Sequence, residues 1–167
     1  MKIVIGLQKS FRKDIYWFWK LSGSLIQWWT KSDYFHIELA IDGKWITSQT
    51  ERGIEIREYN PNYFSEHFDY YELETVEITS QQKEKFWNWM RGEENTGYDW
   101  VGIYLTQIFK LDWEAKEKWF CSEMVARILQ LLYVEEFIDC KPNRLSPNDI
   151  YLLLKDKMKK IEPKKRD

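Results

Sequence analysis

The pattern of apolar and polar residues divides the chain into two halves of different periodicity. In the first half, short apolar and aromatic runs predict strands over residues 2–6, 34–41, 44–49, 53–57 and 69–78. In the second half, apolar residues recur at helical spacing, which predicts helices that begin near Thr79, Asp99, Cys121 and Ser146. Strands followed by helices are typical of an α+β fold, in which an antiparallel β-sheet packs against helices.

Local signals at turns and helix ends sharpen this prediction. Asp42-Gly43 lies between two apolar runs, which is the signature of a two-residue hairpin turn. Thr79 followed by Gln82 predicts a capping box at one helix start, and residues 91–97 are expected to form a loop after that helix. Ser146-Pro147 predicts the start of the last helix, with serine as the N-cap and proline at the first helical position.

An aromatic stretch near the N-terminus is expected to form a short helix rather than a membrane span. Residues 15–29 are rich in aromatic side chains, but polar residues such as Lys20 interrupt them, and the stretch is too short and too polar to cross a bilayer. Ser22 can cap a helix that ends at Trp29. A further helix is expected over residues 99–109, with an aspartate as its cap.

Size and charge favour one globular domain. The chain has 167 residues, of which 44% are hydrophobic and 31% are charged, and this composition disfavours disorder. We expect the domain to cover residues 1–154, followed by a basic tail over residues 155–167 that forms a solvated, frayed end. The net charge of −2 gives no electrostatic footprint for nucleic acid, so no nucleic-acid partner is expected.

The two cysteines, Cys121 and Cys140, bear on the cellular compartment. They are too few to form a disulfide framework in a chain of this length, and they favour a reducing environment. The first residues lack the apolar region and the cleavage site of a signal peptide. Together these features predict a cytoplasmic location.

Aromatic residues make up 17% of the chain and include ten tryptophans. Such side chains build a bulky core, and they also line clefts that bind apolar ligands. The two interpretations are compatible. The aromatic content suits an acyl chain or an aromatic side chain as ligand, and it suits core packing equally well.

Cys121 is the strongest candidate for a nucleophile. The helical pattern of apolar residues begins directly after it, so its thiol is expected at a helix N-terminus. The helix dipole and the free N–H groups at that end favour an anion and lower the pKa of a thiol. The alternative interpretation is that Cys121 is a small buried apolar residue without chemistry.

His36 is the candidate base for this thiol. It lies on the first strand of the predicted hairpin, and Glu38 follows on the same face. If the turn has two residues, Thr47 and Gln49 on the second strand lie opposite these two side chains. One face then presents all four together, whereas a slip of one residue would bring Ser48 in place of Gln49. A histidine base needs a partner that fixes its tautomer, and this face offers a carboxylate and an amide; the alternative is a structural histidine.

Two other interpretations of the titratable residues are weaker. His67, the second histidine, lies in a loop-like segment over residues 61–68 and is a poorer candidate for the base. A zinc site is conceivable from His36, Glu38 and Cys121, but the chain lacks the paired ligand spacing of zinc motifs. We therefore expect neither a metal nor another cofactor.

Five short stretches follow one another along the chain: Leu25–Ser32, Tyr34–Leu39, Tyr98–Trp100, Phe120–Glu123 and Leu145–Tyr151. Their order and spacing, over residues 20–152, resemble the circularly permuted papain-like hydrolases. These form the permuted branch of the NlpC-type amidases, which includes the lecithin:retinol acyltransferase-like enzymes. The histidine precedes the cysteine, which is the reverse of papain's order and marks the permuted branch. The resemblance implies a circularly permuted papain-like fold with the cysteine at a helix N-terminus.

The resemblance also implies a function. It points to a cysteine peptidase or amidase that hydrolyses a peptide amide, or an acyl-lipid substrate, through a thioester intermediate. Cys121 would be the nucleophile and His36 the base. The backbone N–H of Cys121 would donate to the oxyanion.

The third catalytic member stays open. Many relatives carry a polar or acidic residue on the second hairpin strand, where this chain has Thr47, Ser48 or Gln49. Glu38 is our first choice for the residue that orients the imidazole, and Gln49 is the second. The chain also lacks the Gly-Asp pair that these proteins commonly have after the first strand.

A different class of function must be weighed against hydrolysis. The same fold can serve as a non-catalytic module that binds a peptide or a lipid in an aromatic cleft. The presence of both Cys121 and His36 argues against this alternative, because a protein that only binds needs neither residue.

Overall fold

The structure of the protein is a computed structural model that describes residues 2–11, 24, 27–28, 31–49, 53–61, 64–73, 77–94, 96–99 and 118–162. The predicted helix over residues 22–29 lies largely outside the described residues. So does the predicted helix over residues 99–109, of which only Asp99 is described.

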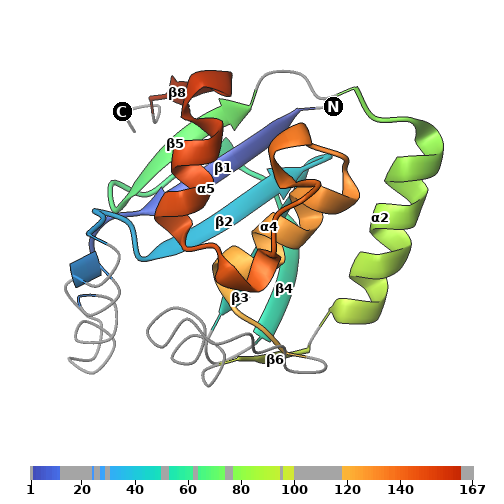
Figure 1. Cartoon of the computed structure of the whole chain (residues 1–167), viewed down its shortest axis with the longest axis horizontal. Coiled ribbons are helices and arrows are strands. Elements are labelled where there is room, and N and C mark those ends of the chain that lie inside the picture. The colour runs from blue at the N-terminus through green and yellow to red at the C-terminus, as the bar shows by residue number, and fades with distance from the viewer. Residues whose placement is uncertain are drawn as a thin grey trace.

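An antiparallel sheet forms the centre of the molecule (Figure 1). Among the described residues it has six strands in the order β4-β3-β2-β1-β5-β8, and every neighbouring pair is antiparallel. The strands are β1 (Ile3–Gln8), β2 (His36–Ile41), β3 (Lys44–Gln49), β4 (Gly53–Glu58), β5 (Phe68–Leu73) and β8 (Met158–Ile161). The α+β class with an antiparallel sheet, predicted from the sequence, is therefore confirmed.

Helices cover one face of this sheet, and α4 and α5 lie across the strands in Figure 1 with α2 beside them. The helices are α2 (Ser80–Glu93), α4 (Cys121–Leu131) and α5 (Pro147–Leu154), with short 3₁₀ turns η3 (Glu135–Phe137), η4 (Pro142–Arg144) and η5 (Lys155–Lys157). A separate parallel pair, β6 (Gly97–Tyr98) and β7 (Lys118–Trp119), lies at one end of the sheet. No helix within the described residues is long and apolar enough to cross a membrane.

Successive side chains of a strand point to opposite faces of the sheet, and those of β1 are buried on both faces. Its odd-numbered residues join the main core beneath the helices. Val4 joins a smaller cluster on the opposite face, together with Ala40, Trp45 and Tyr70. The sheet therefore has an apolar layer on each side, and the larger one holds α4 against the middle strands.

The β2–β3 hairpin has the predicted two-residue turn and the predicted register. Ile41 pairs with Lys44, and Leu39 pairs with Ile46. Asp42 and Gly43 both have positive φ, at 55° and 74°, as a tight turn between twisted strands requires. This register puts Thr47 opposite Glu38.

The predicted helix caps at Thr79 and Ser146 are confirmed. The Thr79 side chain accepts from the backbone N–H of Gln82, and the Gln82 side chain accepts from the backbone N–H of Thr79. Ser146 forms the same reciprocal pair with Asp149, and Pro147 occupies the first turn of α5. These caps fix the helix starts because they satisfy N–H groups that have no partner within a helix.

Two predicted boundaries are wrong. The strand expected over residues 69–78 ends at Leu73, since residues 77–79 lead into the capping box of α2. The loop expected over residues 91–97 begins later, because α2 continues to Glu93. Gly92 suggested in the sequence that the helix ends before it. The helix continues past this glycine, and Arg91 in its last turn interacts favourably with the helix dipole.

The basic segment after residue 154 is also not a frayed end over its whole length. Residues 158–161 form β8, which pairs with β5 as the sixth strand of the sheet. Lys159 and Lys160 are exposed while Met158 and Ile161 are half-buried. In the sequence, an edge strand with exposed lysines cannot be told from a charged tail. The folded unit therefore extends past the expected boundary at residue 154.

Candidate active site

Cys121 is the first residue of α4, as predicted, and its thiol lies at the N-terminus of this helix. The residue before it, Phe120, is in extended conformation and offers no side-chain cap. The chain leading into α4 is tied to the hairpin because Ser48 Oγ donates to the carbonyl of Trp119 at 2.8 Å. This bond holds the start of α4 beside the ends of β2 and β3.

The Cys121 thiol and the His36 imidazole are close enough that each shifts the pKa of the other. His36 is the first residue of β2, so its ring lies at the end of the sheet that faces the start of α4. The backbone N–H groups of Ile37 and Ser122 act in the same direction as His36 and lower the pKa of the thiol. The structure therefore brings together the two residues that the sequence proposed as nucleophile and base.

Glu38 and Thr47 lie on the other side of the imidazole. His36 Nε2 is 3.3 Å from Glu38 Oε1 and 3.4 Å from Thr47 Oγ1. The Thr47 hydroxyl donates to the same carboxylate oxygen at 3.2 Å. Because Nε2 faces these oxygens, it carries a proton, and Nδ1 is the ring nitrogen left to face Cys121.

The electrostatics of the pair favour an imidazolium beside a thiolate. Burial disfavours the charged imidazole, but Cys121 and then Glu38 outweigh burial and raise the pKa of His36 to about 10. Burial likewise disfavours the thiolate, but the charge and hydrogen bond of His36 outweigh it and lower the pKa of Cys121. The N-terminal end of α4 acts in the same direction. The charge of each group therefore stabilises the charged form of the other.

Glu38 is suited to support this imidazolium because it stays ionised although it is buried. Burial by itself raises a carboxyl pKa, but His36 first, then Trp45 and Arg57, outweigh it and lower the pKa of Glu38. Of the candidates for the third residue, Glu38 and Thr47 contact the ring. Ser48 instead donates to a backbone carbonyl. The side chain of Gln49 lies outside the described part of the chain, so its role as orienter stays a prediction.

Tyr98 also contacts Cys121, and the sequence reasoning did not assign it to the site. Its hydroxyl is close enough to the thiol and to the backbone N–H of Cys121 that both affect its pKa. Burial, and then the charge of Cys121, raise the pKa of Tyr98 well above its usual range, so the hydroxyl keeps its proton. The sequence signal was the Tyr98–Trp100 stretch, which carried the family resemblance but no role of its own.

The position of Tyr98 depends on a close approach of two backbones. β6 pairs with β7 just before α4, so Tyr98 lies opposite Trp119. On the other side, the N–H of Ile54 donates to the carbonyl of Thr96 at 3.2 Å. Gly53 has φ of 70°, and a Cβ there would lie 1.7 Å from that carbonyl oxygen. Only glycine permits this contact.

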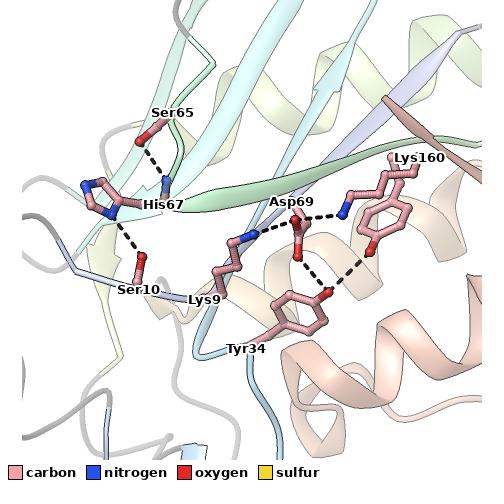
Figure 2. A network of polar contacts seen from close by, with 8 residues as sticks. Lys9, Ser10, Tyr34, Ser65, His67, Asp69 and Lys160 are labelled. Atoms are coloured by element: carbon pink, nitrogen blue, oxygen red, sulfur yellow. Dashed lines mark hydrogen bonds and ion pairs between the residues drawn. The ribbon is translucent and has the colours of Figure 1, made fainter. Parts of the chain in front are cut away.

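His67, the weaker candidate, lies in the polar network shown in Figure 2. Its Nδ1 is 2.9 Å from Ser10 Oγ, its backbone N–H donates to Ser65 Oγ at 3.2 Å, and its carbonyl accepts from the N–H of Lys9 at 2.9 Å. These contacts tie the residues that follow β1 to those that precede β5. His67 therefore has a structural role.

Asp69 organises the rest of this network, next to the start of the histidine strand. Figure 2 shows Lys9 and Lys160 on either side of its carboxylate, at 2.8 and 3.2 Å from Oδ1. Tyr34 Oη donates to Oδ2 at 3.1 Å and lies 3.2 Å from the hydroxyl of Tyr71. Since Tyr34 lies two residues before β2, this network anchors the chain where it enters the strand that carries the imidazole.

The zinc alternative gains no support. Within the part of the chain that the structure describes, no three His, Cys, Asp or Glu side chains are grouped so as to hold a metal ion. Both cysteines are free. The chemistry that the arrangement offers is that of a thiolate, an imidazolium, a carboxylate and a phenol.

Comparison with known proteins assigns no family to the chain. No protein-family model matches it, and no curated protein sequence matches it either. The function must therefore be argued from the site itself.

Proposed function

We propose that this protein is a cysteine hydrolase of peptidase or amidase type, built on a circularly permuted papain-like fold. One observation carries the proposal: a cysteine that begins a helix lies beside an imidazole whose Nε2 faces a buried carboxylate. This is the general arrangement for acyl transfer: a nucleophile, a base beside it, and a group that orients the base. The order of histidine strand before cysteine helix supports the permuted form of the fold.

In the first half of the reaction, the Cys121 thiolate attacks the carbonyl carbon of an amide or ester. The carbonyl oxygen becomes an oxyanion, to which the Cys121 N–H and the Tyr98 hydroxyl beside the sulfur would donate. The C–N or C–O bond then breaks, and His36 gives its Nδ1 proton to the leaving amine or alcohol. The products are a thioester on Cys121 and a neutral imidazole.

In the second half, a water molecule attacks the thioester. The neutral His36 takes one proton from this water, and the resulting tetrahedral intermediate expels the Cys121 thiolate. A carboxylic acid leaves, and the imidazolium–thiolate pair is restored. Glu38 stabilises the imidazolium throughout and keeps Nδ1 directed at the sulfur.

The substrate that we propose is a peptide amide or an acyl ester. An aromatic surface adjoins the imidazole, since the ring of Phe68 meets His36 edge-on at 6.4 Å and stacks on Tyr70. Such a surface suits an apolar acyl group or side chain. The cytoplasmic location is part of the same proposal, and the free state of Cys121 and Cys140 supports it.

The test is covalent labelling with a panel of activated esters and peptide amides, followed by mass analysis of both thiols. We expect an acyl adduct on Cys121 and turnover with the substrate that forms it. Cys140 is the internal control, because burial, with Asp139 beside it, raises its pKa. A protein that only binds would give neither adduct nor turnover and would keep its ligand affinity in Cys121→Ala.

A further inference from the structure

Glu38 has a nearly buried carboxylate whose two oxygens face different partners. Its side chain is 7% exposed. Oε1 faces His36 and Thr47, at 3.3 and 3.2 Å. Oε2 accepts a hydrogen bond from Trp45 Nε1 and lies 3.5 Å from Arg57 Nη2. A buried carboxylate oxygen without a donor is costly, so the partners of Oε2 matter as much as those of Oε1.

Trp45 is the partner that can fix the orientation of this carboxylate. An indole N–H only donates, so it specifies one oxygen, whereas the Thr47 hydroxyl can rotate and can also accept. Arg57 is half exposed, and its attraction is screened by solvent. Trp45 lies opposite Ala40 in the hairpin, which makes it a diagonal neighbour of Glu38 within reach of a large side chain.

The indole is itself held in place. Trp45 is 6% exposed, and its ring stacks on Tyr59 with centroids 5.8 Å apart and packs against Tyr70 at 6.0 Å. Gly6 on β1 lies opposite Glu38 and leaves room for the indole, because a Cβ there would lie 3.1 Å from the ring. The donor therefore reaches the carboxylate from a packed, fixed ring.

We propose that Trp45 is a positioning residue: its indole N–H holds the Glu38 carboxylate with Oε1 toward His36, and so keeps the imidazole directed at Cys121. Trp45 touches no reacting atom and acts only through Glu38. Its consequence for catalysis rests on the proposed function. The orientation of the histidine can be measured without it.

The measurement is a pH titration of the imidazole ring signals by NMR. His36 and His67 are the only histidines in the chain, so two sets of signals suffice and His67 is an internal control. We expect Trp45→Phe to lower the pKa of His36 by about one unit, because a displaced carboxylate supports the imidazolium less.

The other titratable or charged groups around the histidine and its carboxylate remain in this variant. They come from four elements: Arg57 on β4, Tyr70 on β5, Tyr98 on β6 and Cys121 on α4. A shift in Trp45→Phe therefore reports the lost donor rather than a lost charge.

The chain offers a matched control. Trp87 Nε1 donates to Asp42 Oδ2 at 3.3 Å at the opposite end of β2, so Trp87→Phe removes the same kind of bond away from the site. It should leave the His36 titration unchanged. In a Glu38→Gln background, Trp45→Phe should cause no further shift. An unchanged His36 pKa in folded Trp45→Phe, or an equal shift in both backgrounds, would overturn the proposal.

A second measurement uses the wild-type fold, in case Trp45→Phe does not fold. The indole N–H signal of Trp45 should move with the same apparent pKa as the His36 ring, because both share one carboxylate. An indole signal that ignores the His36 titration would contradict the inference.

The two proposals can fail separately. If the protein hydrolyses a substrate, Trp45→Phe should lower kcat by roughly tenfold with little change in KM, since positioning acts on the reaction rather than on binding. A shift of the His36 pKa without any turnover in the wild type would keep the positioning role and refute the hydrolase. Turnover with no shift would do the reverse.

Discussion

Cys121 and Cys140 are the same residue in opposite surroundings. Cys121 begins α4 beside His36, whose charge lowers the pKa of the thiol against the effect of burial. Cys140 follows η3, where its thiol donates to the carbonyl of Glu136 at 3.1 Å, and burial raises its pKa. Burial acts in the same direction on both thiols. The difference comes from one cationic neighbour and a helix terminus, which reverse its effect at Cys121 alone.

The two histidines repeat this contrast. His36 has a carboxylate on one side of its ring and a thiol on the other, and both raise its pKa. His67 has the hydroxyl of Ser10 as its ring partner and ties the residues before β5 to those after β1. A histidine becomes a candidate base through the groups on both of its nitrogens, not through its presence in the chain.

The largest difference between Cys121 and Cys140 is expected when each thiol is removed in turn. Cys121→Ala should reduce hydrolysis of the labelling substrate to the background rate, because no other group can form the thioester. Cys140→Ala should keep the wild-type rate. His36→Ala should be as severe as Cys121→Ala, and the double variant should be no worse than either. The measurement is kcat/KM for each variant. Turnover that survives Cys121→Ala would put the chemistry elsewhere.

Tyr98 tests whether the site stabilises an oxyanion. If the Tyr98 hydroxyl donates to the developing charge, Tyr98→Phe should lower kcat by roughly 10²-fold with a small change in KM. Tyr133→Phe is the control, because Tyr133 is an exposed tyrosine after α4. A kcat for Tyr98→Phe within a factor of two of wild type would restrict Tyr98 to holding the backbone of Cys121.

Thiol labelling sharpens the contrast between the histidines. At pH 6.5 the protonated His36 supports the Cys121 thiolate, so iodoacetamide should modify Cys121 faster than Cys140 by about tenfold or more. His36→Ala should slow Cys121 by a similar factor, because burial is then unopposed by the cation. His67→Ala should leave both rates unchanged. Equal rates for the two thiols in the wild type would remove the physical basis for a nucleophile.

The smallest expected effects concern thermal stability and come from substitutions at two glycines with positive φ. Gly43 has φ of 74° and nothing within 4 Å of an added Cβ, so Gly43→Ala should cost only about 1 kcal/mol of strain and a few degrees in Tm. Gly53→Ala meets the carbonyl of Thr96 as well and should lower Tm at least about twice as much. Thermal unfolding of both variants gives the comparison. Equal shifts in Tm would show that the backbone at Thr96 can move away from an added Cβ at residue 53 with little loss of stability.

Strong local signals predicted much of the fold. The Asp42-Gly43 turn set the hairpin register, and the capping box at Thr79 set the start of α2, because both depend on neighbouring residues only. The basic edge strand β8 could not be predicted in this way. Its pairing with β5 involves residues far away along the chain, and its exposed lysines look like a solvated tail.

The candidate site, like the fold, could be predicted from the sequence only in part. Cys121, His36 and Glu38 could be proposed because a helix start and a two-residue period put them at known positions. Tyr98 and Trp45 could not, since each reaches the site through packing. Tyr98 needs the close backbone contact at Gly53, and Trp45 needs the space above Gly6.

The sequence by itself determined the order of the elements, the hairpin register and the residue at the start of α4. These follow from periodicity, turn chemistry and capping, which act over a few residues. Only the tertiary structure decided that His36 and Cys121 meet, that Glu38 is buried yet ionised, and which cysteine is activated. Those outcomes depend on burial and on charges brought together from strands and a helix that are distant in the chain, and no local pattern encodes them.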